Sequence, residues 1–267
     1  MYFSFPLSKL LHLLAKKLKP MQIIPLSEGV FTIDKTKIFV PFNTATDNLQ
    51  QRNTGSLLVE VQPFVVKTEN DILLLDAGLG FTRNGALQLH TNLKAYGIEP
   101  THITKVLLTH LHKDHAGGIS MQDRLGNYRL AFPNAVYYVQ QKELDFAMDT
   151  GFPSFMAEEI SVLQNNPQVV FLNGDGSIDG YIYYHVTGAH SPHHQVYWIK
   201  ENGETIFFGG DDAPQLQQMK NKFVAKYDFN GKKCMELRQL WWQQGKDQGW
   251  TFLFYHDVKT PYYTFPV

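Results

Sequence analysis

The stretch from Val106 to Gly118, VLLTHLHKDHAGG, places three histidines and an aspartate within six residues, directly after an apolar run. In extended backbone the side chains alternate between two faces, so His110 and His112 point to the same side. Asp114 and His115 follow where the chain can turn back. The spacing therefore predicts two adjacent metal positions, one taking His110 and His112 and the other taking Asp114 and His115. A surface loop that is merely rich in histidine is the alternative, and this crowding argues against it.

Imidazole and carboxylate ligands suit zinc, with manganese, iron or cobalt as chemical alternatives. Four further stretches each place a potential ligand, or a carboxylate that could orient one, after an apolar run. They are DILLLDAGLG, VTGAHSPHHQ, IFFGGDDAP and FLFYHD, which supply Asp76, His190, Asp211 and His256. Loops held by the ends of strands commonly carry binding and catalytic residues. We therefore expect these side chains to join the histidine cluster.

The elements that must position these residues are short strands with interspersed helices. Helical periodicity is present at 86–98 and 230–249, whereas 135–148 begins as a strand and becomes a helix. The run 250–257 is typical of a closing strand. Strands and helices are followed by a second similar series, which predicts two packed sheets flanked by helices within one domain.

The N-terminal residues 1–20 form a separate segment, and the single domain is expected at 21–267. Five leucines between Leu7 and Leu18 fall at helical spacing with lysines mostly off that stripe, which predicts an amphipathic helix stopped by Pro20. We expect this helix to dock on the domain or on a partner subunit, and attachment to a membrane surface stays open. No apolar run reaches the length that spans a bilayer.

Composition narrows the function classes. The 267 residues carry a formal net charge of −1, which argues against a nucleic-acid partner. The one cysteine, Cys234, rules out an internal disulfide framework and fits a reducing compartment, so a cytoplasmic location is expected. Trp241 and Trp242 indicate core packing or, together with the N-terminal helix, a homodimer contact.

Taken in order, the five stretches resemble the five motifs of the metallo-β-lactamase superfamily, and the resemblance runs from about Gln22 to His256. The segments AFPNAVYYVQQKELDFAM and GAHSPHHQVYW are similar to those of the lactonase and organophosphate-hydrolase-like branch. The resemblance implies a four-layer αβ/βα sandwich: two mostly antiparallel mixed β-sheets flanked by helices, with a binuclear metal site at one edge.

The resemblance also implies the ligands of two divalent metal ions, with zinc as the first choice. One ion would be held by His110, His112 and His190, the other by Asp114, His115 and His256, and both by Asp211. Asp76 would orient a ligand histidine through a hydrogen bond, a support that metal sites usually have.

Two departures from the family pattern matter. Typical members carry a Pro-Gly pair before the third-motif histidine, whereas this chain reads Thr187-Gly188-Ala189-His190. His190 keeps the register of a ligand, so we expect His194 to be structural and His193 to be exposed. In the fourth motif Asp211 aligns with the bridging acid, although Asp212 could also reach a metal.

The implied chemistry is hydrolysis by a hydroxide shared between the two metals. Asp114 and Asp211 are the catalytic candidates, and Asp211 could take a proton as the tetrahedral intermediate forms. We expect an ester or lactone substrate, either like an acyl-homoserine lactone or another small ester. A thioesterase of glyoxalase type and a phosphotriesterase are the alternatives, and a non-catalytic metal-binding or sensing domain is the alternative of another class.

Several other residues have no predicted role in the site. Phe152 and Phe155 could form a lid over it or belong to a packed loop. The remaining histidines are expected at the surface or as satisfied core residues; they are His12, His90, His102 and His185. Cys234 is expected to be a small buried hydrophobe.

Overall fold

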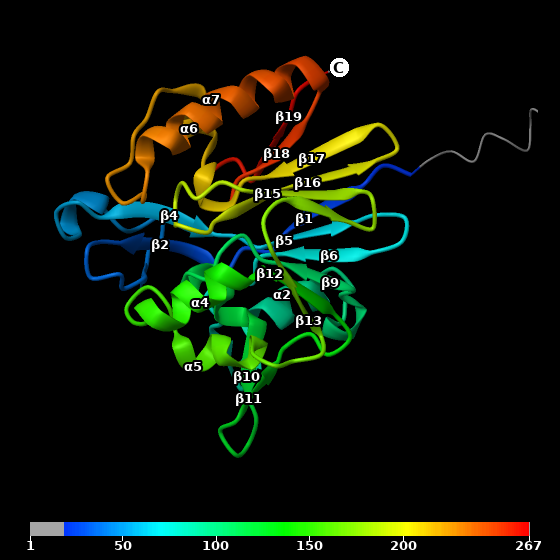
Figure 1. Cartoon of the computed structure of the whole chain (residues 1–267). Helices are drawn as coiled ribbons and strands as arrows, with labels where there is room; N and C mark the ends of the chain where they lie inside the picture. The colour runs from blue at the N-terminus through cyan, green and yellow to red at the C-terminus, as the bar shows by residue number, and fades with distance from the viewer. Residues whose placement is uncertain (1–18, 267) are drawn as a thin grey trace, which may run out of the picture.

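The computed structural model describes residues 19–266 (Figure 1). The helix expected at 1–20 therefore lies outside the described residues, apart from its last two positions. Within the described range, no helix combines the length and the apolar character needed to span a membrane.

One six-stranded sheet carries the first half of the chain, and three of its five strand pairings are parallel. Its strands, in spatial order, are β1 (Gln22–Pro25), β5 (Phe64–Lys67), β6 (Ile72–Leu75), β9 (Lys105–Leu107), β12 (Val136–Gln140) and β13 (Val169–Leu172). Strand β6 has the sequence ILLL and is packed on both faces, which explains its continuous apolar run.

A second six-stranded sheet carries the later part of the chain, and only its β17–β18 pairing is parallel. Its strands, in spatial order, are β14 (Gly176–Ile178), β15 (Ile182–Val186), β16 (Gln195–Glu201), β17 (Glu204–Phe208), β18 (Thr251–Leu253) and β19 (Tyr262–Thr264). The strand expected at 250–257 is present as the shorter β18, but it is not the closing one, because β19 follows and pairs with β18 at the sheet edge.

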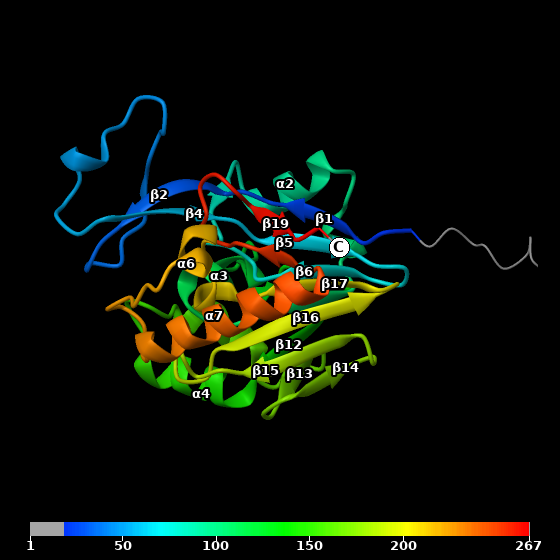
Figure 2. The same cartoon turned by 90° about the horizontal axis from the view of Figure 1, so that it is seen from above.

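A smaller three-stranded sheet projects from the body beside these two (Figure 2). Its strands, in spatial order, are β3 (Val40–Pro41), β2 (Gly29–Ile33) and β4 (Leu57–Val61). The chain passes from β4 to β5 through Pro63, which has no amide hydrogen to continue a ladder. Two short ribbons complete the strands: β7 (Thr82–Arg83) with β8 (Ala86–Leu87), and β10 (Ser120–Gln122) with β11 (Tyr128–Leu130).

Helices cover the outer faces of both large sheets (Figures 1 and 2). The longer ones are α2 (Gln88–Ala95) and α4 (Gln141–Thr150) on the first sheet and α7 (Gly231–Gln248) on the second. The short ones are α3 (Lys113–Ala116), α5 (Ala157–Ile160) and α6 (Leu216–Lys220). The expected order of helix, sheet, sheet and helix is confirmed, although the first sheet has more parallel pairings than antiparallel ones.

Three apolar clusters hold these layers together. The central one joins the facing sides of the two sheets, for example Phe64 and Leu75 with Phe208 and Leu253. A second cluster fills the space between the first sheet and its helices. The third lies under α7 and contains Trp241, with Trp242 packed against it, so these two rings contribute to the core of the chain itself.

Parallel pairing decides where the candidate ligands lie. Strands β6 and β9 are parallel and in register at Leu75 and Leu107, so both carboxyl ends reach one edge of the first sheet. Strands β17 and β18 are likewise parallel, with Phe208 opposite Leu253. Residues that follow parallel neighbours leave the sheet at the same edge. The four loops that carry Asp76, the histidine cluster, Asp211 and His256 are thereby brought to adjoining sheet edges.

Candidate metal centre

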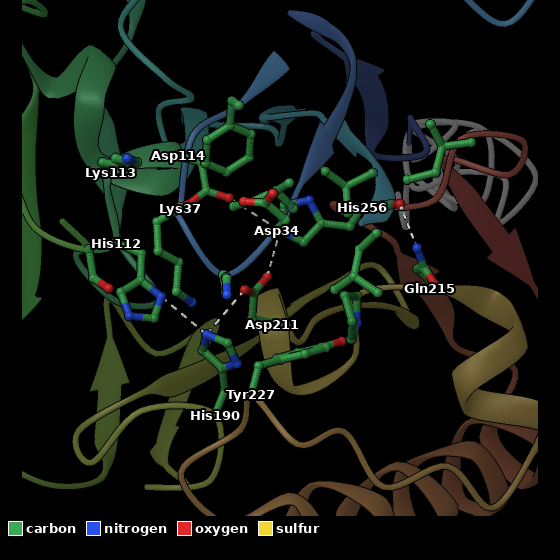
Figure 3. A pocket seen from close by; sticks show the side chains of 18 of the residues that line it. Asp34, Lys37, His112, Lys113, Asp114, His190, Asp211, Gln215, Tyr227 and His256 are labelled. Atoms are coloured by element: carbon green, nitrogen blue, oxygen red, sulfur yellow. Dashed lines mark hydrogen bonds and ion pairs between the residues drawn. The ribbon is translucent and has the colours of Figure 1, made fainter. Parts of the chain in front are cut away.

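The seven ligand candidates come together in two groups. Figure 3 shows the five of them that line the cavity. In the first group one ligand atom from each residue lies within 4.8 Å of the others; its members are His110, His112, His190 and Asp211. The same limit holds for the second group, which consists of Asp114, His115 and His256. The assignment of these residues as ligands rests on how well their side chains fit a metal ion.

Asp211 lies between the two groups and turns one carboxylate oxygen toward each. Its Oδ1 atom is 3.1 Å from His115 Nε2 and 3.0 Å from His256 Nε2. Its Oδ2 atom is 3.2 Å from His190 Nε2 and 4.0 Å from His110 Nε2. A single carboxylate is therefore placed to serve both groups at once.

Unsatisfied polar atoms test whether these residues fit a metal. His115 Nε2 and Asp211 Oδ1 are buried and close to each other, but neither makes a hydrogen bond of good geometry, which is costly unless another group satisfies them. In the first group His112 Nδ1 lies 2.8 Å from His110 Nε2 and 3.1 Å from His190 Nε2. A set of converging nitrogen and oxygen atoms is the donor chemistry that zinc prefers, so the residues fit divalent metal ions.

The second nitrogen of four histidines is held by the surrounding chain. His115 Nδ1 is 2.7 Å from Asp76 Oδ2, and His190 Nδ1 is 2.9 Å from Asp228 Oδ1. His256 Nδ1 is 2.6 Å from the Glu60 carbonyl oxygen, and His110 Nδ1 is 3.0 Å from Thr109 Oγ1. Partners of this kind fix the ring and its tautomer, which leaves Nε2 free to bind a metal.

Asp76 has the partner that a buried carboxylate needs. It is fully buried and accepts hydrogen bonds from the Thr109 amide and the Thr109 hydroxyl, both at 2.8 Å, besides its contact with His115. Its φ of 52° is in the left-handed region, which aspartate tolerates better than most residues. The left-handed turn after β6 directs the carboxylate back toward the neighbouring β9 loop.

Two histidines of the first group are held neutral. Burial lowers the pKa of His110 well below its usual value, and the nearby His115 and His112 add to the effect. Burial also lowers the pKa of His112 well below its usual value, and the nearby His190 lowers it further. Neutral imidazole is the form that binds metals.

The centre of the site is rich in negative charge. Burial acts to lower the pKa of His115, His190 and His256, but Asp211 and the other carboxylates outweigh it and raise all three. In return these histidines hold the pKa of Asp211 well below its usual value despite its burial. The site thus attracts positive charge to its centre, and divalent cations would supply it in place of protons.

Asp212 and His194 form a support beside the ligands. Asp212 is fully buried, its Oδ2 is 3.1 Å from His194 Nδ1, and its Oδ1 accepts the His190 amide hydrogen at 2.8 Å. His194 Nε2 accepts the Asp211 amide hydrogen at 3.3 Å. Of the two adjacent acids, only Asp211 faces the two groups. His193 is half-buried near Phe146, so the expectation that it is exposed was wrong.

Replacing His194 with alanine should leave the metal content unchanged while lowering stability by about 3 kcal/mol, because Asp212 loses the partner of a buried charge. Elemental analysis of the soluble variant measures the first effect and urea unfolding measures the second. Loss of a metal equivalent would mean that His194, and not His190, holds a metal.

Several residues that contact the site were not singled out in the sequence. Tyr255 stacks on His115 with ring centroids 4.1 Å apart, and its hydroxyl donates to the Asp114 carbonyl oxygen at 2.6 Å. Its place directly before His256 was an available signal. Asp228, which holds His190, lies in the loop before α7, where no pattern indicated it.

Glu28 is a buried acid near the site. Burial raises its pKa from 4.5 to about 7, and Asp114 adds to this, while a hydrogen bond from the Leu79 amide opposes it. Folding therefore favours the protonated carboxyl, so this stabilisation is full below about pH 4.5 and is lost as the pH rises through about 7.

Replacing Glu28 with glutamine should remove that pH dependence. Relative to the variant, the wild-type chain should lose about 2 kcal/mol of stability between pH 5.5 and pH 8. Urea unfolding of both proteins, stripped of metal with a chelator, measures the difference at the two pH values. If the wild type and the variant differ in stability by the same amount at pH 5.5 and at pH 8, Glu28 does not titrate in this range.

The metal centre forms the floor of a cavity of about 550 Å³ (Figure 3). One ligand or more from each group reaches it: His112, Asp114, His190, Asp211 and His256. Most of its apolar wall comes from the three-stranded sheet and its loops, and the rest from the segments before α6 and α7; these residues are Ile33, Phe39, Leu57, Leu58, Val59, Pro214 and Phe223. Such a space suits a small, partly apolar substrate.

The segment that could form a lid packs beside the cavity. Phe155 is buried, with its ring centroid 4.9 Å from that of His112 and 5.7 Å from that of Phe146. Phe152 is 77% exposed. Ser154, between them, lines the cavity, whereas neither phenylalanine does. Phe155 therefore supports His112 from behind.

The remaining histidines in the described range lie outside the two groups. His90 packs edge-on against Phe132, His102 Nδ1 accepts the Glu99 amide hydrogen, and His185 contacts Asp175. His12 belongs to the residues that the structure does not describe. Cys234 is buried, with Sγ 3.5 Å from Asp212 Oδ1.

Comparison with known proteins supplies independent information. Residues 59–225, more than half of the chain, match the family model described as the metallo-beta-lactamase superfamily. The matched range contains every ligand candidate except His256, which only the folded structure brings to the others.

Individual relatives agree with this match. N-acyl homoserine lactonase AttM of Agrobacterium fabrum (strain C58) is 28% identical over 149 residues, 51% of this chain, and the match spans about half (51%) of its length. The crystal structure of a probable metal-dependent hydrolase from Staphylococcus aureus has a TM-score of 0.72 at 22% identity, covering 93% of each chain. AidC, a dizinc quorum-quenching lactonase solved with a product, has a TM-score of 0.68 at 19% identity, covering 92% of this chain and 90% of its own. Both structures share the fold.

Proposed function

This chain belongs to the metallo-β-lactamase superfamily, and we propose that it is a metal-dependent hydrolase that cleaves an ester or lactone bond. The observation that carries the proposal is the position of Asp211, with one carboxylate oxygen toward each of two separate groups of ligand atoms. A purely structural metal site has no need for a cavity above it, and this centre forms the floor of one.

We assign His110, His112 and His190 to one metal, Asp114, His115 and His256 to the other, and Asp211 to both. Zinc is the first choice for this donor set. Two divalent ions held there would act as Lewis acids and lower the pKa of a water molecule enough to make hydroxide available near neutral pH.

The two carboxylates on the cavity floor have different roles in this proposal. The pKa of Asp211 is held far below its usual value, so it stays ionised, which suits a ligand shared by two metals more than a proton acceptor. Asp114 also faces the cavity, with Oδ2 3.4 Å from His256 Nε2. We assign to Asp114, through the carboxylate oxygen that does not bind a metal, the proton that the attacking water releases and that the departing oxygen takes up when the ester bond breaks.

The wall of the cavity supports a small ester-type substrate. Its apolar side chains would hold an acyl chain or a lactone ring, while the hydroxyl of Tyr227 and the amide of Gln215 line the same space. The lactonase relative favours a lactone over the two alternatives, a thioester of glyoxalase type and a phosphotriester. All three would use the same metal ligands.

The test combines metal analysis with a substrate panel. The purified chain is reconstituted with zinc, its metal content is measured, and acyl-homoserine lactones, aryl esters, thioesters and phosphotriesters are assayed in parallel. Two metal equivalents with the highest kcat/KM on lactones or esters would support the proposal. Preference for a thioester or a phosphotriester would replace the substrate class. Full metal loading with no turnover would favour a metal-binding or sensing domain.

A further inference from the structure

Lys37 is a charged side chain in the cavity that the proposed chemistry does not use. It lies in the loop between β2 and β3, is half-buried, and lines the cavity together with His112 and Asp211. Figure 3 shows it on the same side of the cavity as His112. Within residues 19–266 its ammonium group has no hydrogen bond or ion pair. A half-buried cation without a partner is available to a ligand.

The backbone at Lys37 is held in an unusual conformation. Its φ is 60°, in the left-handed region that costs a residue with a Cβ about 1 kcal/mol. A tight turn fixes it, because the Lys37 amide donates to the Asp34 carbonyl oxygen at 3.0 Å. Strain of this kind persists where the surrounding structure enforces it, and it is common at ligand-binding positions.

The one acid beside Lys37 is already engaged elsewhere. Asp34 Oδ1 accepts the Thr36 amide hydrogen at 2.8 Å, and Asp34 Oδ2 accepts from Asn53 Nδ2 at 2.7 Å. Asp34 therefore shapes the turn and does not pair with Lys37.

The charged residues of the cavity wall leave an excess of positive charge. Apart from the ligand candidates, the cavity is lined by Lys35, Lys37 and Lys113 against the single acid Asp34. The Lys113 ammonium lies 5.9 Å from the ring of Phe39, a residue of the same wall. Divalent ions on the floor would add to this charge. A neutral ester makes no use of such a wall, whereas an anionic group would be attracted to it.

We propose that Lys37 is the centre of a subsite for a carboxylate carried by the substrate, so that the preferred substrate is an acidic ester or lactone. This inference rests on the proposed function, because it names the substrate of that same site. The reacting carbonyl would lie over the metal centre, and the carboxylate would lie at the cavity wall against the Lys37 ammonium, with Lys113 adding to the positive potential.

The first experiment measures binding without catalysis. Isothermal titration of the zinc-reconstituted chain compares succinate, glutarate, adipate and suberate, each with the monocarboxylate of equal chain length. The best dicarboxylate should bind about tenfold more tightly than its partner, the effect expected for one charge-assisted contact. The Lys37→Met variant should reduce this preference to less than about twofold. Lys246→Met, which removes an exposed lysine of α7, should retain it.

The second experiment uses kinetics on matched neutral and carboxylate-bearing esters. Lys37→Met should raise KM about tenfold for the acidic ester only, with kcat little changed. The inference is overturned if the wild-type chain shows no preference for any dicarboxylate, or if the preference survives in Lys37→Met. If the chain hydrolyses neutral esters but does not bind dicarboxylates more tightly than monocarboxylates, the subsite alone is refuted. If it binds dicarboxylates more tightly but hydrolyses no ester, the proposed function alone is refuted.

Discussion

Replacing Asp211 with alanine should lower hydrolysis by at least about a thousandfold and reduce the metal content of the chain. Asp211 is the only candidate whose side chain faces both ligand groups, so its loss removes an oxygen ligand from each. Lewis-acid stabilisation of a transition state amounts to several kcal/mol, which corresponds to this loss of rate. The assay is kcat/KM on the best substrate of the panel, with elemental analysis of the same preparation.

The fold should largely survive this change. Asp211 lies in the short 3-10 helix η5 (Gly210–Asp212), whose position is held by Asp212 and its contact with Arg238. Asp247→Ala, an exposed acid of α7, is the matched control and should have normal activity. His112→Ala should behave as Asp211→Ala does. Near-normal turnover in either variant, with circular dichroism like that of the wild type, would refute the assignment of these ligands.

The second large effect is expected from Asp76→Asn, a change that keeps the shape of the side chain. Asp76 accepts from Thr109 and contacts His115 Nδ1, which keeps the proton of the neutral ring on Nδ1. An asparagine amide can instead donate to Nδ1. That donation places the proton on Nε2, the atom that faces Asp211. A protonated Nε2 cannot bind a metal, so we expect metal affinity to fall 10- to 100-fold.

Competition with a fluorescent zinc chelator measures this affinity directly. The Thr109→Ser variant keeps the hydroxyl that donates to Asp76 and serves as the control, with affinity close to that of the wild type. If Asp76→Asn binds zinc as tightly as the wild-type chain does, the carboxylate does not set the tautomer of His115. Its role would then be limited to the turn after β6.

The sequence carried enough information to predict the fold class and to nominate the site residues. The cluster from His110 to His115 is local, so its spacing alone indicates metal chemistry, and each remaining candidate follows an apolar run that ends a strand. Parallel pairing of neighbouring strands then carries these ends to adjoining sheet edges, as β6 with β9 and β17 with β18 demonstrate.

The resemblance to the family already implied how the candidates divide between two metals, but only the tertiary structure decided which atoms they present. The family resemblance favoured Asp211 over Asp212, but sequence spacing left both within reach of a metal, because adjacent residues differ in the direction that the folded loop gives them. Nor could it show that His112 turns Nδ1 toward the first group while His110 and His190 turn Nε2.

Most of the residues that hydrogen-bond to the ligand histidines could not be predicted from the sequence either. Asp228 and the Glu60 carbonyl contact His190 and His256 from 38 and 196 positions away along the chain. Lys37 enters the cavity through a turn fixed by Asn53. Periodicity and motif spacing indicate which side chains share a face of one helix or strand. The contacts described above form between separate loops, so they depend on how those loops pack against each other. The sequence by itself therefore determined the chemistry and the frame of the site, and only the folded chain decided its geometry.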